Sequence, residues 1–106
     1  MRNQELLNTL SDCINKCNYC ADACLDEDNV KMMVRCIRID RICASVCATV
    51  ADVLASKYSN VQGLMNYCIE ICEECAKECD KHEHQHCKDC AEACRKCAEA
   101  CRNYSA

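Results

Sequence analysis

The chain has 106 residues and a formal net charge of −4 at pH 7, and it contains 16 cysteines, one glycine and no proline, phenylalanine or tryptophan. This length predicts one small domain, residues 1–106, and the negative charge argues against a nucleic-acid partner. No apolar run approaches the length of a membrane span, and the first ten residues lack the apolar segment of an export signal, so a cytoplasmic protein without a membrane partner is expected.

The first predicted helix runs from about Asn3 to Leu25. Its inward stripe begins with Leu6 and Leu10 and continues as cysteines spaced by four, three and four residues. This is the spacing of one face of an α-helix. The cysteines of this stripe are Cys13, Cys17, Cys20 and Cys24. The acidic link 26–29 follows, and its side chains are suited to cap the next helix.

The second predicted helix spans about Asn29 to Ser56, and its inward stripe includes Met32. Asp40 stands where a fourth cysteine of this stripe would fall. The cysteines themselves are Cys36, Cys43 and Cys47. A carboxylate is a poor ligand for a soft metal ion. We therefore expect Asp40 to accept hydrogen bonds from thiols or to pair with an arginine such as Arg41.

The third predicted helix follows the turn 57–59, where Ser59 and Gln62 have the spacing of a capping box. Its stripe starts with Val61 and Met65 and continues with four cysteines at the same steps as in the first helix. These are Cys68, Cys72, Cys75 and Cys79.

The connection 80–86 carries three histidines, and a fourth predicted helix then ends near Tyr104. The histidines are His82, His84 and His86. Cysteine recurs in the fourth helix at steps of three, four, three and four, between residues that are nearly all strong helix formers. These cysteines are Cys87, Cys90, Cys94, Cys97 and Cys101.

Short connections make consecutive helices antiparallel, so the expected fold is all-α, an up-down-up-down four-helix bundle with a cysteine-lined core. Its two ends differ. One end, predicted to be a closed apolar plug, collects Leu6, Leu10, Val50, Leu54, Val61, Leu64 and Tyr104. The opposite end, which we call the mouth, collects soft or borderline metal ligands, namely Cys24, Met32, Met33, Cys36, Cys79, His82, His84, His86 and Cys87.

Two interpretations of the cysteine stripes involve no metal. A core of bare thiols would fill less volume than the leucines of an ordinary bundle. Disulfides within one helix are excluded, because Cβ atoms at i and i+4 lie about 5–6 Å apart, whereas a disulfide needs about 3.8 Å. Bridges between helices are geometrically allowed, but a cytosolic chain is not expected to keep them. Both interpretations are therefore disfavoured.

Metal binding is the remaining interpretation, and thiolates with nearby methionine select soft ions, chiefly Cu(I), with zinc and iron–sulfur clusters as competitors. A zinc ion with four thiolates carries a net charge of −2, so about four such sites would bury about eight negative charges without basic residues on the stripes. A Cu(I) ion and a thiolate are neutral together. A continuous sulfur column therefore favours multiple Cu(I) ions.

The combination of these stripes with the segments 36–43 and 78–87 resembles the cysteine-rich four-helix-bundle copper storage proteins, in particular their leaderless cytosolic branch. The resemblance covers essentially the whole chain. It implies a homotetramer of bundles that each store many Cu(I) ions on thiolates, and loading through the end that carries the histidine and methionine residues. A copper donor or acceptor is a further conceivable partner. Leu6, Leu10 and Met65 stand where the most cysteine-rich relatives continue the thiol column, so a smaller copper content is expected.

Three functions are thus open to this chain. The first is a non-enzymatic Cu(I) store, and the second is a metallothionein-like zinc or cadmium buffer. The third is a thiol–disulfide oxidoreductase that uses Cys87 and Cys90, where a helix N-terminus would lower the pKa of Cys87. A single redox pair leaves the other fourteen cysteines unexplained, and no βαβ context accompanies it. The store is the preferred interpretation.

Overall fold

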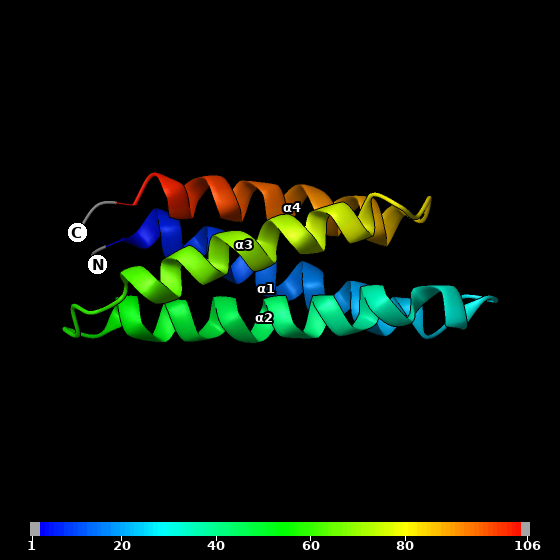
Figure 1. Cartoon of the computed structure of the whole chain (residues 1–106), viewed down its shortest axis with the longest axis horizontal. Coiled ribbons are helices and arrows are strands. Elements are labelled where there is room, and N and C mark those ends of the chain that lie inside the picture. The colour runs from blue at the N-terminus through cyan, green and yellow to red at the C-terminus, as the bar shows by residue number, and fades with distance from the viewer. Residues whose placement is uncertain (1–2, 105–106) are drawn as a thin grey trace.

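The computed structural model describes residues 3–104, which form an elongated bundle of four long helices with extents of 45 × 19 × 17 Å (Figure 1). The helices are α1 (Gln4–Cys24), α2 (Val34–Ala55), α3 (Gln62–Cys79) and α4 (Gln85–Arg102). A short 3₁₀ helix, η1 (Val30–Met33), precedes α2. No helix in this part of the chain is both long enough and apolar enough to cross a membrane.

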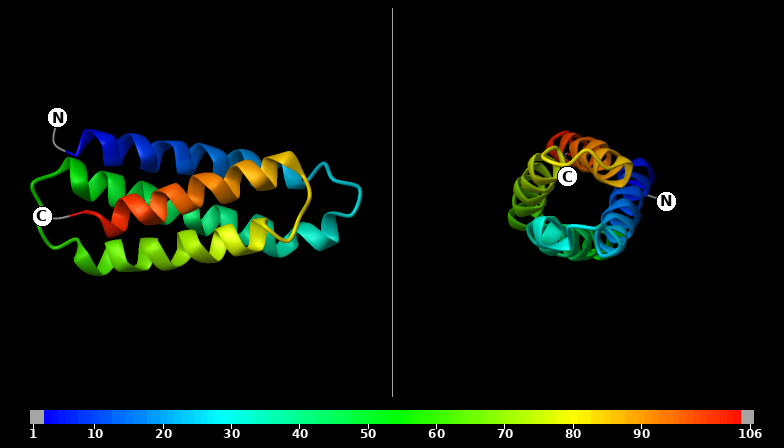
Figure 2. Two further views of the ribbon diagram at one scale, coloured as in Figure 1. Left: turned by 90° about the horizontal axis from the view of Figure 1, so that it is seen from above. Right: turned by 90° about the vertical axis from the view of Figure 1, so that its right-hand side faces the viewer.

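Each helix packs against its two neighbours in a square arrangement. Helix α1 contacts α2 and α4, and α3 contacts the same two helices. Viewed along the bundle, the four helices surround one common axis (Figure 2). The start of α1 and the end of α4 lie at the same end as the connection between α2 and α3 (Figure 1). The predicted antiparallel up-down-up-down bundle is confirmed.

Apolar side chains fill the end of the bundle at which α1 begins. Leu10, Val50 and Met65 are completely buried, and Leu6 and Leu54 are nearly so. Burial of side chains of this size contributes roughly 1.5–3 kcal/mol each. This end is therefore the closed plug that the sequence predicts, and it holds the helices together without using any thiol.

Both predicted helix caps are wrong. Helix α2 starts at Val34 because η1 replaces its first turn, and no side chain caps either helix. Helix α3 starts at Gln62, with Val61 at the N-cap and no side-chain cap hydrogen bond. The capping box fails because Ser59 lies two residues before the N-cap position, which Val61 occupies. The carbonyl of Ser59 accepts a hydrogen bond from the backbone N–H of Val61 at 3.0 Å. The side-chain amide of Gln62 donates a hydrogen bond to Asn66 at 2.9 Å instead.

Candidate metal centre

All sixteen cysteines are buried, and all are free thiols. They project from the four helices into the bundle interior and form a column along its axis. Neighbouring sulfurs on different helices lie at 3.6 Å for Cys17 and Cys94 and at 3.7 Å for Cys43 and Cys72. A disulfide requires about 2.05 Å. The core is therefore lined by unpaired thiols, as predicted.

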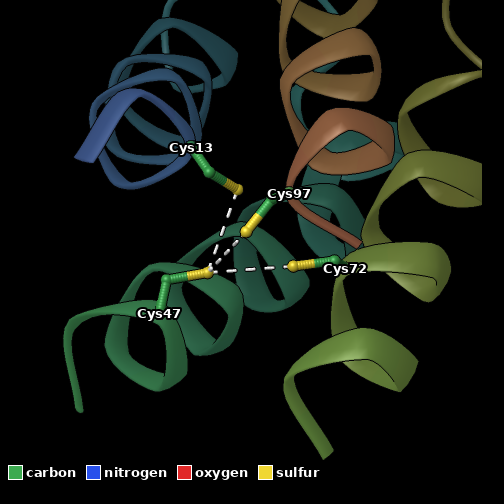
Figure 3. A group of neighbouring side chains, drawn as sticks. All are labelled: Cys13, Cys47, Cys72 and Cys97. Carbon is green, nitrogen blue, oxygen red and sulfur yellow. Dashed lines mark hydrogen bonds between the residues drawn. The ribbon is translucent and has the colours of Figure 1, made fainter. Parts of the chain in front are cut away.

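Figure 3 shows one group of four sulfurs, each from a different helix. The Sγ atom of Cys47 lies 3.9 Å from that of Cys13, 3.8 Å from that of Cys72 and 3.8 Å from that of Cys97. All four ligand atoms lie within 4.8 Å of one another. Four sulfur atoms this close together are able to bind one soft metal ion.

Successive groups of sulfurs share members. Cys17 and Cys94 form one group with Cys13 and Cys43, and they form the next group with Cys75 and Cys90. Shared ligands favour metal ions that are bridged by thiolates over separate sites with four private ligands each. The column therefore suits a chain of bridged ions better than isolated tetrahedral centres.

Asp40 occupies the position of a thiol in this column and is fully buried. Its Oδ1 atom accepts hydrogen bonds from the thiols of Cys75 at 3.1 Å, Cys90 at 3.4 Å and Cys79 at 3.6 Å. These contacts are the predicted ones. Together with Cys20, Cys79 and Cys90, its carboxylate also belongs to one of the groups that bring four ligand atoms within 4.8 Å of one another.

The alternative partner expected for Asp40 is wrong. Arg41 donates to Asn18 on α1 at 3.3 Å, on the exposed surface of the bundle. Adjacent residues of a helix point about 100° apart, so Arg41 cannot follow Asp40 into the core. Salt bridges on the outer faces of the helices are exposed, as for Glu92 and Lys96 at 3.1 Å.

Burial changes the acid–base properties of the core. It raises the pKa of Asp40 from 3.8 to about 7, and the neighbouring Cys90 adds to this rise. Burial also raises the pKa of Cys24, and it raises that of Cys87 to about 12. Thiols at the mouth therefore hold their protons at neutral pH in the metal-free protein. Because a bound metal ion requires thiolates, a metal ion that bound to these thiols would release their protons.

The metal-free protein is expected to lose stability as the pH rises from about 4 to 7. In this window the unfolded chain releases the Asp40 proton while the folded chain retains it, so the folded state binds more protons. A pKa rise from 3.8 to about 7 corresponds to at most about 4 kcal/mol. Asp40→Asn should remove this slope, which urea unfolding of both proteins under reducing conditions will measure. Parallel pH profiles for the two proteins would contradict the assignment.

The three histidines at the mouth have different surroundings. The Nδ1 atom of His86 lies 3.3 Å from the sulfur of Cys20 and 3.6 Å from that of Cys87. His84 stacks on His86, with ring centroids 5.4 Å apart. His82 bonds instead to the buried carboxylate of Glu78 at 3.0 Å. Of these rings, that of His86 makes hydrogen-bond contact with the sulfur column.

The two methionines at the mouth also differ. Met32 is 65% exposed, whereas Met33 is buried. Both line a surface hollow of about 410 Å³ together with His82 and His84. The sequence pattern selects Met32 for the inward stripe, but the 3₁₀ turn of η1 rotates the chain and places Met33 inward. Met32 therefore lies at the rim of the mouth.

Sequence reasoning missed the two carboxylates that hold the histidines. Glu27 lies 2.7 Å from Nε2 of His86 and 3.4 Å from Nδ1 of His84. Glu78 bonds to His82 and also pairs with Arg35 at 3.2 Å. Glu78 lies one turn before His82 in the sequence, which was an available signal. Glu27 is 59 residues from His86, and no local pattern connects them.

Fold and site together define a helical-bundle metal-binding protein whose ligands are thiolates. In comparisons with known proteins, residues 1–106 match the family model described as Csp, copper storage protein. The chain therefore belongs to the copper storage protein family. Membership in this non-enzymatic family confirms the resemblance found in the sequence. It favours copper storage over a zinc or cadmium buffer and over a thiol–disulfide oxidoreductase.

Individual relatives agree with this assignment. The structure of the Cu(I)-bound copper storage protein BsCsp3 is 37% identical and superposes with a TM-score of 0.93, covering 100% of both chains. A cytosolic copper storage protein from Streptomyces lividans, solved with five coppers, is 41% identical with a TM-score of 0.87 over 92% of this chain and 86% of that one. The cysteine-rich protein YhjQ of Bacillus subtilis is 41% identical over 77% of this chain and 76% of its own length.

Proposed function

We propose that this chain is a cytoplasmic store that takes up Cu(I) at the mouth and holds it along the whole sulfur column. The protein stores Cu(I) and binds multiple copper ions through core cysteine thiolates. The observation that carries the proposal is the continuity of the column, in which neighbouring groups share sulfurs from plug to mouth. The proposed ligands are Cys13, Cys17, Cys20, Cys24, Cys36, Cys43, Cys47, Cys68, Cys72, Cys75, Cys79, Cys87, Cys90, Cys94, Cys97 and Cys101.

The charges of the core support Cu(I) as the stored ion. Among residues 3–104, the buried polar or charged side chains are Asp40 and Glu78, and both are acidic. Over the part of the chain that the structure describes, no buried cation compensates the negative charge that four-thiolate zinc sites would carry, and an uncompensated buried charge is costly. Cu(I) with one thiolate per ion is neutral. The interior therefore favours a monovalent soft ion.

The unlike ends of the bundle support uptake at the mouth. The plug end is filled by Leu10, Val50 and Met65. At the other end His86 contacts the thiols of Cys20 and Cys87. The residues His82, His84 and Met32 line a surface hollow at this end. Imidazole and thioether groups bind Cu(I). We assign the three histidines and Met32 to the uptake path.

Replacing His82, His84 and His86 together by asparagine is expected to slow Cu(I) uptake, and its removal by a chelator, by about tenfold or more, since a lost ligand weakens each transient complex. The copper content at saturation should stay close to wild type, because the column thiolates are intact. Stopped-flow mixing with a Cu(I)–chelator complex measures the rate, and equilibrium metal analysis measures the content. Glu83→Gln, at the same end and with a side chain 96% exposed, is the control. Wild-type kinetics in the triple variant would refute uptake through the histidines.

Assembly and location complete the proposal. A homotetramer, which the family resemblance implies, would bury exposed apolar side chains such as Tyr67 and Ile42, which flank a groove between α2 and α3. Light scattering on the copper-free chain tests this part, and a monomeric mass would reject it. Cytoplasmic location rests on the description of the Streptomyces lividans relative as cytosolic.

A further inference from the structure

Glu27 connects two turns at the mouth that are far apart in the sequence. It follows the end of α1. Its Oε2 atom lies 2.7 Å from Nε2 of His86, which is in the first turn of α4, and 3.4 Å from Nδ1 of His84, which directly precedes α4. The two imidazoles stack with an interplanar angle of 7°. One carboxylate oxygen therefore faces both rings of this stack.

The opposite edge of His86 faces sulfur. Its Nδ1 atom lies 3.3 Å from Cys20 and 3.6 Å from Cys87, and His86, Cys20, Cys24 and Cys87 form a group whose ligand atoms lie within 4.8 Å of one another. The imidazole therefore lies between a carboxylate and the thiols. Its Nε2 atom faces the carboxylate, and its Nδ1 atom faces the thiols.

These contacts determine which nitrogen is able to bind a metal ion. An ionised carboxylate only accepts hydrogen bonds, whereas a neutral imidazole has one donor nitrogen and one acceptor nitrogen. The short contact to Glu27 places the N–H of His86 on Nε2. The lone pair is then on Nδ1, beside the thiols. A hydrogen bond of this kind also fixes the orientation of a ligating ring and raises its basicity.

We propose that Glu27 is a positioning residue of the mouth, which holds His86 in the Nε2–H tautomer and presents Nδ1 to a Cu(I) ion bound by Cys20, Cys24 and Cys87. This inference rests on the proposed uptake of copper at the mouth, and it specifies which histidine passes the ions to the column. His86 is the imidazole ligand that transfers ions to the column. His82 bonds to Glu78 at 3.0 Å rather than to a thiol and lines the surface hollow, so its place is earlier on the uptake path.

The closing experiment has two independent readouts on the full chain, both with reduced protein. Long-range ¹H–¹⁵N NMR of the metal-free protein reports the tautomer of His86. It should show Nε2–H in the wild type and a mixture of tautomers in Glu27→Gln, because an amide is able both to donate and to accept. On addition of one equivalent of Cu(I), the Nδ1 resonance of His86 should shift in the wild type and shift less in the variant. Glu83→Gln removes an equal charge from the same end and should leave both signals unchanged.

Uptake kinetics supply the second readout. Glu27→Gln should slow the initial uptake of Cu(I) by about tenfold, in the range found when the hydrogen-bond partner of a metal ligand is removed. In a His86→Asn background the same change should have little further effect, because residues that act as one unit are not additive. A purely structural tether between the turns would instead slow uptake equally in both backgrounds.

The outcomes separate this inference from the proposed function. An Nδ1–H tautomer in the wild type, or unchanged NMR signals in Glu27→Gln, would overturn the role of Glu27 even if the histidines govern uptake. If His86→Asn takes up copper at the wild-type rate, uptake at the mouth through His86 is wrong, and with it the transfer step assigned here. A tautomer change together with a non-additive kinetic effect would establish both the role of Glu27 and the uptake of copper through His86.

Discussion

Replacing four inner cysteines, Cys17, Cys43, Cys72 and Cys94, by alanine is expected to lower the copper content at saturation by about four ions. Thiolate bridging allows on the order of one Cu(I) per cysteine in the wild type, so each lost sulfur removes about one ion. These four sulfurs lie deep in the column, with Cys17 and Cys94 3.6 Å apart and Cys43 and Cys72 3.7 Å apart. The initial uptake rate should change little, since the mouth is untouched.

The measurement is an anaerobic titration of the reduced protein with Cu(I) against a competing chelator. A Cys17→Ala, Cys94→Ala double variant gives a graded control, since its loss should be about two ions. Circular dichroism of the metal-free variants separates lost ligands from lost structure. Saturation of the wild type at only two to four ions would contradict bridging. Retention of zinc against excess Cu(I) would favour the buffer instead.

Leu10→Ala is expected to destabilise the metal-free protein by about 2–5 kcal/mol, which is the cost found when a buried leucine leaves a cavity. Leu10 is completely buried in the plug, where Val50 and Met65 are its equivalents on other helices. Small domains have a total stability of about 5–15 kcal/mol, so this is a large fraction. The expected loss is large because the core is divided. The plug supplies most of the bulky apolar side chains, whereas the column supplies thiols.

Urea unfolding of the metal-free protein, followed by circular dichroism, measures this loss. Leu25→Ala is the matched control, because Leu25 lies just beyond α1 and is 54% exposed. Copper loading should restore much of the stability of Leu10→Ala, since ions bound only by the folded state cross-link the helices. A wild-type protein that is unfolded without copper would show that the plug is insufficient and that the metal holds the fold.

The sequence by itself determined the fold class, the stripes and the chemistry of the core. Helical periodicity assigns every cysteine to an inward face without knowledge of its neighbours. Short connections then fix the antiparallel order, and this order sends Leu10 to one end and His86 to the other. Ligand type and charge point to Cu(I) from composition alone. These conclusions depend on local spacing and on counting, which the linear chain contains.

Only the tertiary structure decided which groups touch. Asp40 accepts hydrogen bonds from Cys75 and Cys90, which are 35 and 50 positions away in the sequence. His86 contacts Glu27, which is 59 positions away. Such contacts depend on the axial register and rotation of helices against one another, and side-chain packing across the whole bundle sets both. The 3₁₀ turn of η1 shows the same dependence, since it exchanges Met32 for Met33 at the inward position. A helical pattern fixes the face on which a residue lies, but the partner across the core follows from how four such faces fit together.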